Sequence, residues 1–170
     1  MSRLAFIESK IITLHQAAQC AEKKRLKNQK VVFTNGCFDI LHRGHVTYLA
    51  EAASLGDVLF VAVNDDASVR SLGKGGDRPV NPELARALVL ASLGFVDFVV
   101  IFSEPTPLTA IQTIKPDWIV KGGDYNAELS DTQNPRYIVG SNEAKAWGGR
   151  SITIPLVEGY STSAILAKRG

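Results

Sequence analysis

Runs of β-branched and aromatic residues alternate with helical segments along most of this chain. The predicted strands span residues 30–34, 57–64, 96–102, 117–120 and 151–155, and the predicted helices span residues 44–55, 81–93, 106–115 and 161–168. Parallel strands need crossover connections of this kind, and such connections are right-handed in nearly all proteins. The alternation therefore predicts a Rossmann-like, doubly wound α/β fold with a parallel sheet of about five strands.

The chain length predicts a single domain. With 170 residues and a hydrophobic content of 45%, residues 1–170 are expected to bury one core, with residues 1–29 as an N-terminal helical extension. Thr13 and Gln16 have the T-x-x-Q spacing of a capping box, which predicts a helix that ends near Asn28. Proline follows both Asn81 and Thr106, so these two residues are predicted N-caps with proline at the first helical position.

The composition gives no sign of a membrane or nucleic-acid partner. No apolar run approaches the ~18 residues of a membrane-spanning helix, and no apolar signal segment follows Met1. Cys20 and Cys37 fit reduced thiols, so we expect a cytoplasmic protein. The basic run at residues 23–27 has no interleaved aromatic residues and falls at a predicted helix end, where cations complement the helix dipole.

The residues after the first strand have the composition of a phosphate-binding turn. The strand ends in Thr34-Asn35-Gly36-Cys37-Phe38-Asp39, and His42-Arg43-Gly44-His45 opens the next helix. Unpaired backbone N–H groups and the positive end of a helix meet here, and both attract phosphate. The two imidazoles are three residues apart and are expected to face the phosphate from one side. A zinc site made by Cys37, His42 and His45 is an alternative, although a fourth Cys or His is missing nearby.

The predicted sheet brings other polar segments to the same edge. Ligands of such sheets bind beyond the carboxyl ends of the strands, where the chain places residues 34–39, 64–66, 121–124 and 158–163. Lys121 precedes two glycines, and this setting favours a ligand contact over a solvated lysine. The hydroxyl groups at residues 161–163 open the last helix, where they either cap it or bind phosphate.

Several motifs resemble, in the same order, those of the cytidylyltransferase-like nucleotidyltransferases. The G-x-F-D and H-x-G-H signature lies at residues 36–45. Further similar motifs are Val63-Asn64-Asp65-Asp66, Arg78-Pro79-Val80-Asn81-Pro82, Lys121-Gly122-Gly123-Asp124-Tyr125 and Glu158-Gly159-Tyr160-Ser161-Thr162-Ser163. The set is most similar to the branch of the family that adenylylates heptose 1-phosphate for the lipopolysaccharide inner core. The resemblance covers roughly residues 10–168.

The resemblance implies an enzyme that transfers AMP from ATP to D-glycero-D-manno-heptose 1-phosphate and releases pyrophosphate. A phosphate monoester has its second pKa at about 6, so the attacking sugar phosphate is already ionised and needs no general base. The histidines are therefore expected to be donors that stabilise charge on the phosphates. Mg²⁺ is expected to accompany ATP, with no protein ligand identified in the sequence. Relatives imply a homodimer.

The same resemblance assigns roles to individual residues. The implied catalytic residues are His42, His45, Lys74 and Arg86. The implied nucleotide contacts are Thr34, Asn35, Gly36, Phe38, Asp39, Gly44, Lys121, Gly122, Asp124, Ser161, Thr162 and Ser163, and the implied sugar-phosphate contacts are Asn64 and Arg78. Asp39 is expected to brace the turn rather than bind metal, and a surface position on its helix stays open for Arg86. Residues 72–80, rich in glycine, suit an arm that closes over phosphates.

Leu156 helps to identify the branch of the family that this chain resembles. In the CTP-using branches, an arginine stands at the position of Leu156, just before the last motif. Leucine in place of that arginine favours ATP as the nucleotide. Two other functions stay open: a cytidylyltransferase for a polyol or amino-alcohol phosphate, and a nucleotide-sensing module without turnover. The sequence assigns no role to residues 126–140.

Overall fold

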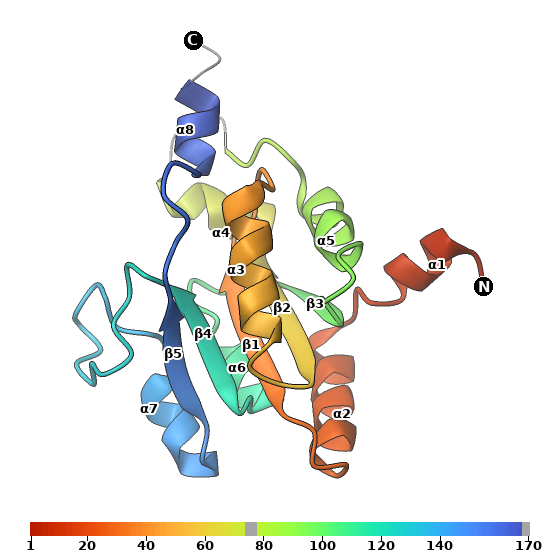
Figure 1. Cartoon of the computed structure of the whole chain (residues 1–170), viewed down its shortest axis with the longest axis vertical. Coiled ribbons are helices and arrows are strands. Elements are labelled where there is room, and N and C mark those ends of the chain that lie inside the picture. Colours follow the sequence, from red (N-terminus) through yellow and green to blue (C-terminus); the bar gives the residue numbers. More distant parts are fainter. Residues whose placement is uncertain (74–77, 168–170) are drawn as a thin grey trace.

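A five-stranded parallel sheet forms the centre of the computed structural model, which describes residues 1–73 and 78–167 (Figure 1). The strands are β1 (Val31–Gly36), β2 (Val58–Asn64), β3 (Phe98–Phe102), β4 (Trp118–Gly122) and β5 (Arg150–Ile154). They lie in the order β3-β2-β1-β4-β5, and every neighbouring pair is parallel. The chain thus winds outward from β1 first to one side and then to the other. The predicted doubly wound α/β fold is confirmed.

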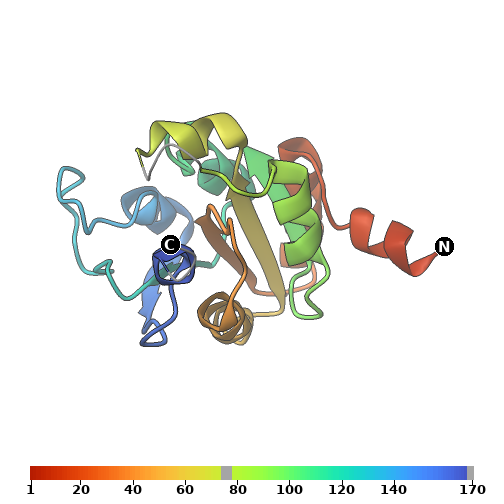
Figure 2. The same cartoon turned by 90° about the horizontal axis from the view of Figure 1, so that it is seen from above.

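Helices cover both faces of this sheet (Figures 1 and 2). The structure contains α1 (Arg3–Glu8), α2 (Leu14–Arg25), α3 (Arg43–Ala53), α4 (Asp66–Ser71), α5 (Glu83–Ala91), α6 (Leu108–Ile114), α7 (Ser141–Ala144), a 3₁₀ turn η1 (Lys145–Trp147) and α8 (Thr162–Ala167). Buried residues of α2, α6 and α7 pack on one face of the sheet, and those of α3 and α5 pack on the other. None of the helices in residues 1–73 and 78–167 is both long and apolar enough to span a membrane.

The central strands contribute to both cores because successive residues point to opposite faces. In β1, Val31 and Phe33 pack toward α2 and α6, whereas Val32 packs toward α3 and α5. All seven residues of β2 are buried. A strand covered on both faces needs no polar alternation, which explains why the sequence of β2 is a continuous apolar run.

Most predicted helix ends differ from the observed ones by one to three residues. The capping box of Thr13 and Gln16 is confirmed, although the helix ends at Arg25. The predicted N-caps Asn81 and Thr106 are wrong: the caps are the next residues, Pro82 and Pro107, and neither makes a side-chain cap bond. The helices α1, α4 and α7 were too short for a helical period to be visible.

The loop that contains residues 126–140 is built from short turns. Asn126, Asp131 and Asn134 each accept the backbone N–H two residues ahead with their side-chain oxygen. The loop extends beyond β4 and β5 in Figure 1, and it returns to the core at the buried residues Tyr137 and Ile138. Side-chain turns of this kind give no hydrophobic period, which accounts for the featureless sequence.

The N-terminal segment is attached to the edge of the sheet through Lys10 and its neighbours. Ile11 forms a parallel bridge with Val99 of β3. The ammonium group of Lys10 donates to the carbonyl oxygens of Ala91, Leu93 and Val96 at 2.9, 3.2 and 2.7 Å. Ala91 is the last residue of α5 and the other two carbonyls follow it, so a cation here also complements the helix dipole.

Replacing Lys10 with methionine is expected to lower the free energy of unfolding by about 1.5–3 kcal/mol, because hydrogen bonds to a charged group are lost and carbonyls at a helix end lose their donor. Urea denaturation measures the change. Lys23→Met is the control, because Lys23 is exposed on α2, and it should change stability by less than about 0.5 kcal/mol. Equal effects of the two substitutions would show that Lys10 does not anchor the segment.

Candidate active site

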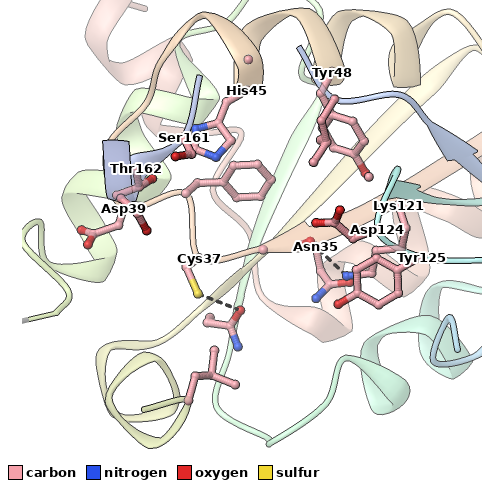
Figure 3. Close-up of a pocket in the computed structure, with 18 of the residues that line it drawn as sticks. Asn35, Cys37, Asp39, His45, Tyr48, Lys121, Asp124, Tyr125, Ser161 and Thr162 are labelled. Carbon is pink, nitrogen blue, oxygen red and sulfur yellow. Dashed lines mark hydrogen bonds between the residues drawn. The ribbon is translucent and has the colours of Figure 1, made fainter. Parts of the chain in front are cut away.

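A cavity of about 920 Å³ lies at the carboxyl ends of the strands (Figure 3). Its walls come from the ends of β1, β2 and β4, the start of α3 and the start of α8. The sequence-derived candidates that line it are Asn35, Gly36, Phe38, Asp39, His42, Gly44, His45, Asn64, Arg78, Lys121, Gly122, Asp124, Ser161, Thr162 and Ser163. The fold thus gathers segments that are more than a hundred residues apart in sequence at one edge of the sheet, as the switch-point rule requires.

The two histidines stack against each other at the start of α3. His42 is the N-cap, and its Nδ1 accepts the backbone N–H of His45 at 3.4 Å. The ring centroids are 3.8 Å apart, with an interplanar angle of 21°. Because Nδ1 of His42 is an acceptor, the proton of the neutral ring lies on Nε2, which leaves a donor for a ligand.

Burial lowers the pKa of both imidazoles. For His45, burial and then the nearby charge of His42 lower the pKa to about 4. Both rings are therefore neutral near pH 7. A neutral imidazole still donates one hydrogen bond to a phosphate oxygen, so the pair suits the role of fixed donors.

The turn before α3 contains a residue in an unusual conformation. Phe38 has a φ of 47°, in the left-handed region that side chains other than glycine rarely adopt. Its ring meets His45 edge-on, with the centroids 5.2 Å apart and an interplanar angle of 65°. A Cβ atom on Gly36 would lie 3.1 Å from this ring, so glycine at position 36 leaves the ring its place.

Asp39 braces this turn with a carboxylate that is fully buried. It accepts Arg78 Nε at 3.0 Å and the backbone N–H groups of Val80 and Asn81 at 2.8 and 3.0 Å. Burial alone would raise the pKa of Asp39, but the N–H groups of Asn81 and Val80 and the guanidinium of Arg78 together lower it. Asp39 thus borders the cavity but acts as a brace, because its carboxylate is buried and both of its oxygens already accept hydrogen bonds.

Two candidates do not line the cavity. Arg86 is 2% exposed and its guanidinium is bound inside the protein, so the structure contradicts both the predicted phosphate contact and a surface position. Thr34 is fully buried, and its hydroxyl lies 2.7 Å from the hydroxyl of Tyr48. The predicted nucleotide contact of Thr34 is therefore not found, because that hydroxyl already has a partner. Lys74 lies outside the described residues.

The polar groups at the ends of β1, β2 and β4 are partly bound to each other. Lys121 Nζ donates to the carbonyl of Asn35 at 3.3 Å and lies 5.1 Å from the centre of the Tyr125 ring (Figure 3). The Oδ1 atom of Asn35 is buried and has no hydrogen-bond partner within residues 1–73 and 78–167. Asn64 donates to Ser68 Oγ at 3.2 Å and faces the thiol of Cys37 at 3.9 Å.

The start of α8 supplies hydroxyl groups to the cavity. Ser161 caps the helix by accepting the N–H of Ala164 at 3.1 Å, so the capping interpretation of this residue holds. Thr162 and Ser163 line the cavity beside it. In Figure 3, Ser161 and Thr162 lie on the side of His45, while Lys121, Asp124 and Tyr125 lie at the other end.

Three tyrosines of the site were missed by sequence reasoning. Tyr48 donates to the carbonyl of Val120 at 2.9 Å and joins β1 to β4 from α3, and burial raises its pKa. Tyr125 lies beside Lys121, and Tyr160 packs against Arg43, whose guanidinium is 5.4 Å from the ring centre. Tyr125 and Tyr160 stood inside motifs already singled out, whereas Tyr48 reads as an ordinary core residue of an amphipathic helix.

The zinc alternative fails. Within the described parts of the chain, no group of three or more His, Cys, Asp or Glu side chains is placed to hold a metal ion. Cys37 instead faces Asn64, and His42 is engaged as a helix cap.

Comparisons with known proteins agree with the geometry. A model of the cytidylyltransferase-like family matches residues 33–168. The chain is 51% identical over 164 residues to D-beta-D-heptose 1-phosphate adenylyltransferase of Bordetella bronchiseptica, and the match covers 96% of each chain. It is 48% identical over 161 residues to the bifunctional protein HldE of Paramagnetospirillum magneticum, which covers 95% of this chain but 31% of that relative. The chain spans about a third of the length of such bifunctional relatives.

Solved structures show the same fold. The lipopolysaccharide core biosynthesis protein from Thermoplasma volcanium is 28% identical with a TM-score of 0.59, and the match covers 78% of this chain and 99% of that one. A pantoate-beta-alanine ligase from Francisella tularensis shares the fold alone, at 17% identity and a TM-score of 0.52 over 85% of this chain and 66% of that one. Family model, sequence relatives and architecture therefore agree that this chain belongs to the cytidylyltransferase-like family.

Proposed function

We propose that this protein is an adenylyltransferase that transfers AMP from ATP to D-glycero-D-manno-heptose 1-phosphate in lipopolysaccharide inner-core synthesis. The observation that carries the proposal is the stacked pair of histidines at the start of α3, which lines a cavity that Lys121 and Arg78 also line. Burial lowers the pKa of both imidazoles, which favours their neutral form as donors. Support for the sugar comes from the Bordetella relative, whose name states heptose 1-phosphate and whose match covers both chains almost completely.

The reaction needs positioning and charge stabilisation more than proton transfer. An oxygen of the sugar phosphate attacks the α-phosphorus of ATP, the bond from this phosphorus to the bridging oxygen breaks, and pyrophosphate leaves. The attacking group is already ionised near neutral pH, so no residue has to remove a proton. His42 and His45 then serve as donors to the oxygens on which negative charge grows. A sensor would need phosphate affinity but no such donors.

Mg²⁺ is part of the proposal as a partner of the triphosphate. The described residues form no cage of three protein ligands, and Asp39 is already fully engaged. Mg²⁺ would therefore arrive with ATP instead of binding to a site made by these residues alone. When bound, the ion offsets negative charge on the phosphates. The homodimer also belongs to the proposal and rests on the resemblance to relatives. The cytoplasmic location belongs to it too, and it is supported by the free thiols of Cys20 and Cys37.

Leu156 is the basis for the choice of nucleotide. Leu156 is 52% exposed and lines the cavity, and its side chain lies against the end of β4, where a Cβ atom on Gly122 would come within 2.8 Å of it. Leucine can pack on a purine but offers no donor to a pyrimidine carbonyl. An arginine at this position would supply that donor.

Pyrophosphate release with each nucleoside triphosphate and a panel of sugar and polyol phosphates tests the function. We expect heptose 1-phosphate and ATP to be the best pair, with kcat/KM for ATP at least about tenfold above that for CTP, the cost of an unmade hydrogen bond. Equal use of CTP would contradict the role of Leu156. Turnover of a polyol phosphate instead of the heptose would assign a different acceptor, and binding without turnover would identify a sensor.

Replacing His45 with alanine should lower kcat by about 10²–10³, because a preorganised donor to developing charge is worth roughly 2.7–4 kcal/mol. Steady-state kinetics measures this loss. His15→Ala is the matched control, because His15 is exposed on α2, where its Nε2 lies 3.1 Å from Nε2 of Gln19. Near-normal turnover of the His45 variant would leave this residue without a catalytic role.

The stability of the protein should depend on pH through His45. Its pKa is about 4 when folded and 6.5 in the reference state, so the unfolded chain binds more protons between these values. The contribution is complete above pH 6.5 and is lost as the pH falls toward 4. Between pH 7 and pH 5, the free energy of unfolding should fall by about 1–2 kcal/mol more in the wild type than in His45→Gln. Parallel pH curves in urea denaturation would contradict the lowered pKa.

A further inference from the structure

Arg86 is a buried arginine on α5 that binds three separate groups of the protein. Its Nε donates to the carbonyl of Asn81 at 2.9 Å, one Nη donates to the carbonyl of Cys37 at 2.7 Å, and the other pairs with the carboxylate of Asp66 at 2.6 Å. The side chain has no exposed surface. A guanidinium presents several donors in a fixed plane, and here each of its three nitrogens donates to a different acceptor.

These three acceptors belong to three different segments of the chain. Cys37 follows β1, Asp66 opens α4 after β2, and Asn81 precedes α5. Asp66 is itself held, because its backbone N–H donates to Glu83 Oε2 at 2.7 Å. Arg86 therefore joins two adjacent strand ends to the segment that carries Arg78.

The contact of Arg86 with Cys37 matters because Cys37 immediately precedes Phe38, the strained residue of the turn. Phe38 has a φ of 47°, and such a conformation persists only where its surroundings hold it. On one side of Phe38 the carbonyl of Cys37 is held by Arg86, and on the other the carbonyl of Asp39 accepts Asn81 Nδ2 at 2.6 Å. The ring of Phe38 is thereby fixed against His45.

We infer that Arg86 is a positioning residue: it fixes the Cys37–Phe38 turn and, through the ring of Phe38, the place of His45 at the cavity. The inference rests on the proposed nucleotidyl transfer. We place Arg86 away from the phosphates, because it does not line the main cavity and each of its three side-chain nitrogens already donates to a group of the protein. Its charge is balanced by Asp66, so it adds little net attraction for a triphosphate.

The matched substitutions Arg86→Lys and Arg86→Met distinguish a positioning residue from a residue that binds phosphate. Lysine keeps the charge but cannot reach three acceptors at fixed angles. We therefore expect both variants to lose kcat by at least about tenfold and to agree within about threefold, because small misplacements of catalytic groups are costly. A phosphate ligand would give the opposite pattern, with the lysine variant far more active than the methionine variant and a raised KM for ATP in the latter.

Controls address folding. Thermal unfolding of each variant fixes an assay temperature at which all are folded. Asp66→Asn removes one charged acceptor at a carboxylate that is 25% exposed, and it should lower kcat in the same direction by a smaller factor. Arg70→Lys, at an exposed position of α4, should match the wild type. Wild-type kcat in the folded Arg86→Lys and Asp66→Asn variants would overturn the inference.

A second readout does not depend on activity. The chain has three histidines, so the NMR signals of the His45 ring can be assigned by single substitutions. In Arg86→Lys these signals should move from their wild-type positions, while those of His15 stay unchanged. Unchanged His45 signals would overturn the positioning role. If the wild type lacks adenylyltransferase activity, the proposed function fails, and the His45 signals still decide whether Arg86 positions the turn.

Discussion

Two buried charged side chains hold the turn between β1 and α3, and the geometry of the site depends on them. A left-handed conformation costs a residue such as Phe38 roughly 1–2 kcal/mol. Arg86 binds the carbonyl before this residue, and the carboxylate of Asp39 accepts N–H groups from the segment that precedes α5. Hydrogen bonds to charged groups contribute about 1.5–3 kcal/mol each, so this arrangement is sufficient to offset the strain. The ring of Phe38 then helps to exclude water from His45, whose low pKa follows from that burial.

The charged groups near the site are of two kinds: some are bound inside the protein, and others face the cavity. Arg86 is neutralised by Asp66 behind the turn. Arg78 is different, because it lines the cavity while its Nε is bound to Asp39. This bridge orients the guanidinium and keeps the carboxylate away from incoming phosphates. A cation oriented by a buried anion is more precise than a solvated lysine, since little side-chain freedom remains to be lost on binding.

Features that depend on the local sequence pattern could be predicted. Features that depend on contacts with distant segments could not. The strands were predictable because β2 is a continuous apolar run, and the gathering of the motifs followed from a general property of parallel sheets. The buried position of Arg86 was not predictable, because an arginine in a helical sequence gives the same pattern whether its side chain faces water or the carbonyl of Cys37. Asn81 precedes a proline, as N-caps often do, but its side chain donates to Asp39 instead. In both cases a tertiary partner overrode a local preference.

Gly44, between the two histidines, allows the first and last motifs to pack closely against each other. A Cβ atom on Gly44 would lie 3.1 Å from the ring of His42 and 3.2 Å from Cβ of Tyr160. The glycine is therefore required for close packing rather than for an unusual backbone angle. It lets the segment before α8 reach the start of α3, where Tyr160 also contacts Arg43. Since residues 162–167 of α8 contribute no buried side chain, this contact helps to hold the start of α8 at the cavity, where Ser161 and Thr162 lie on the side of His45 (Figure 3).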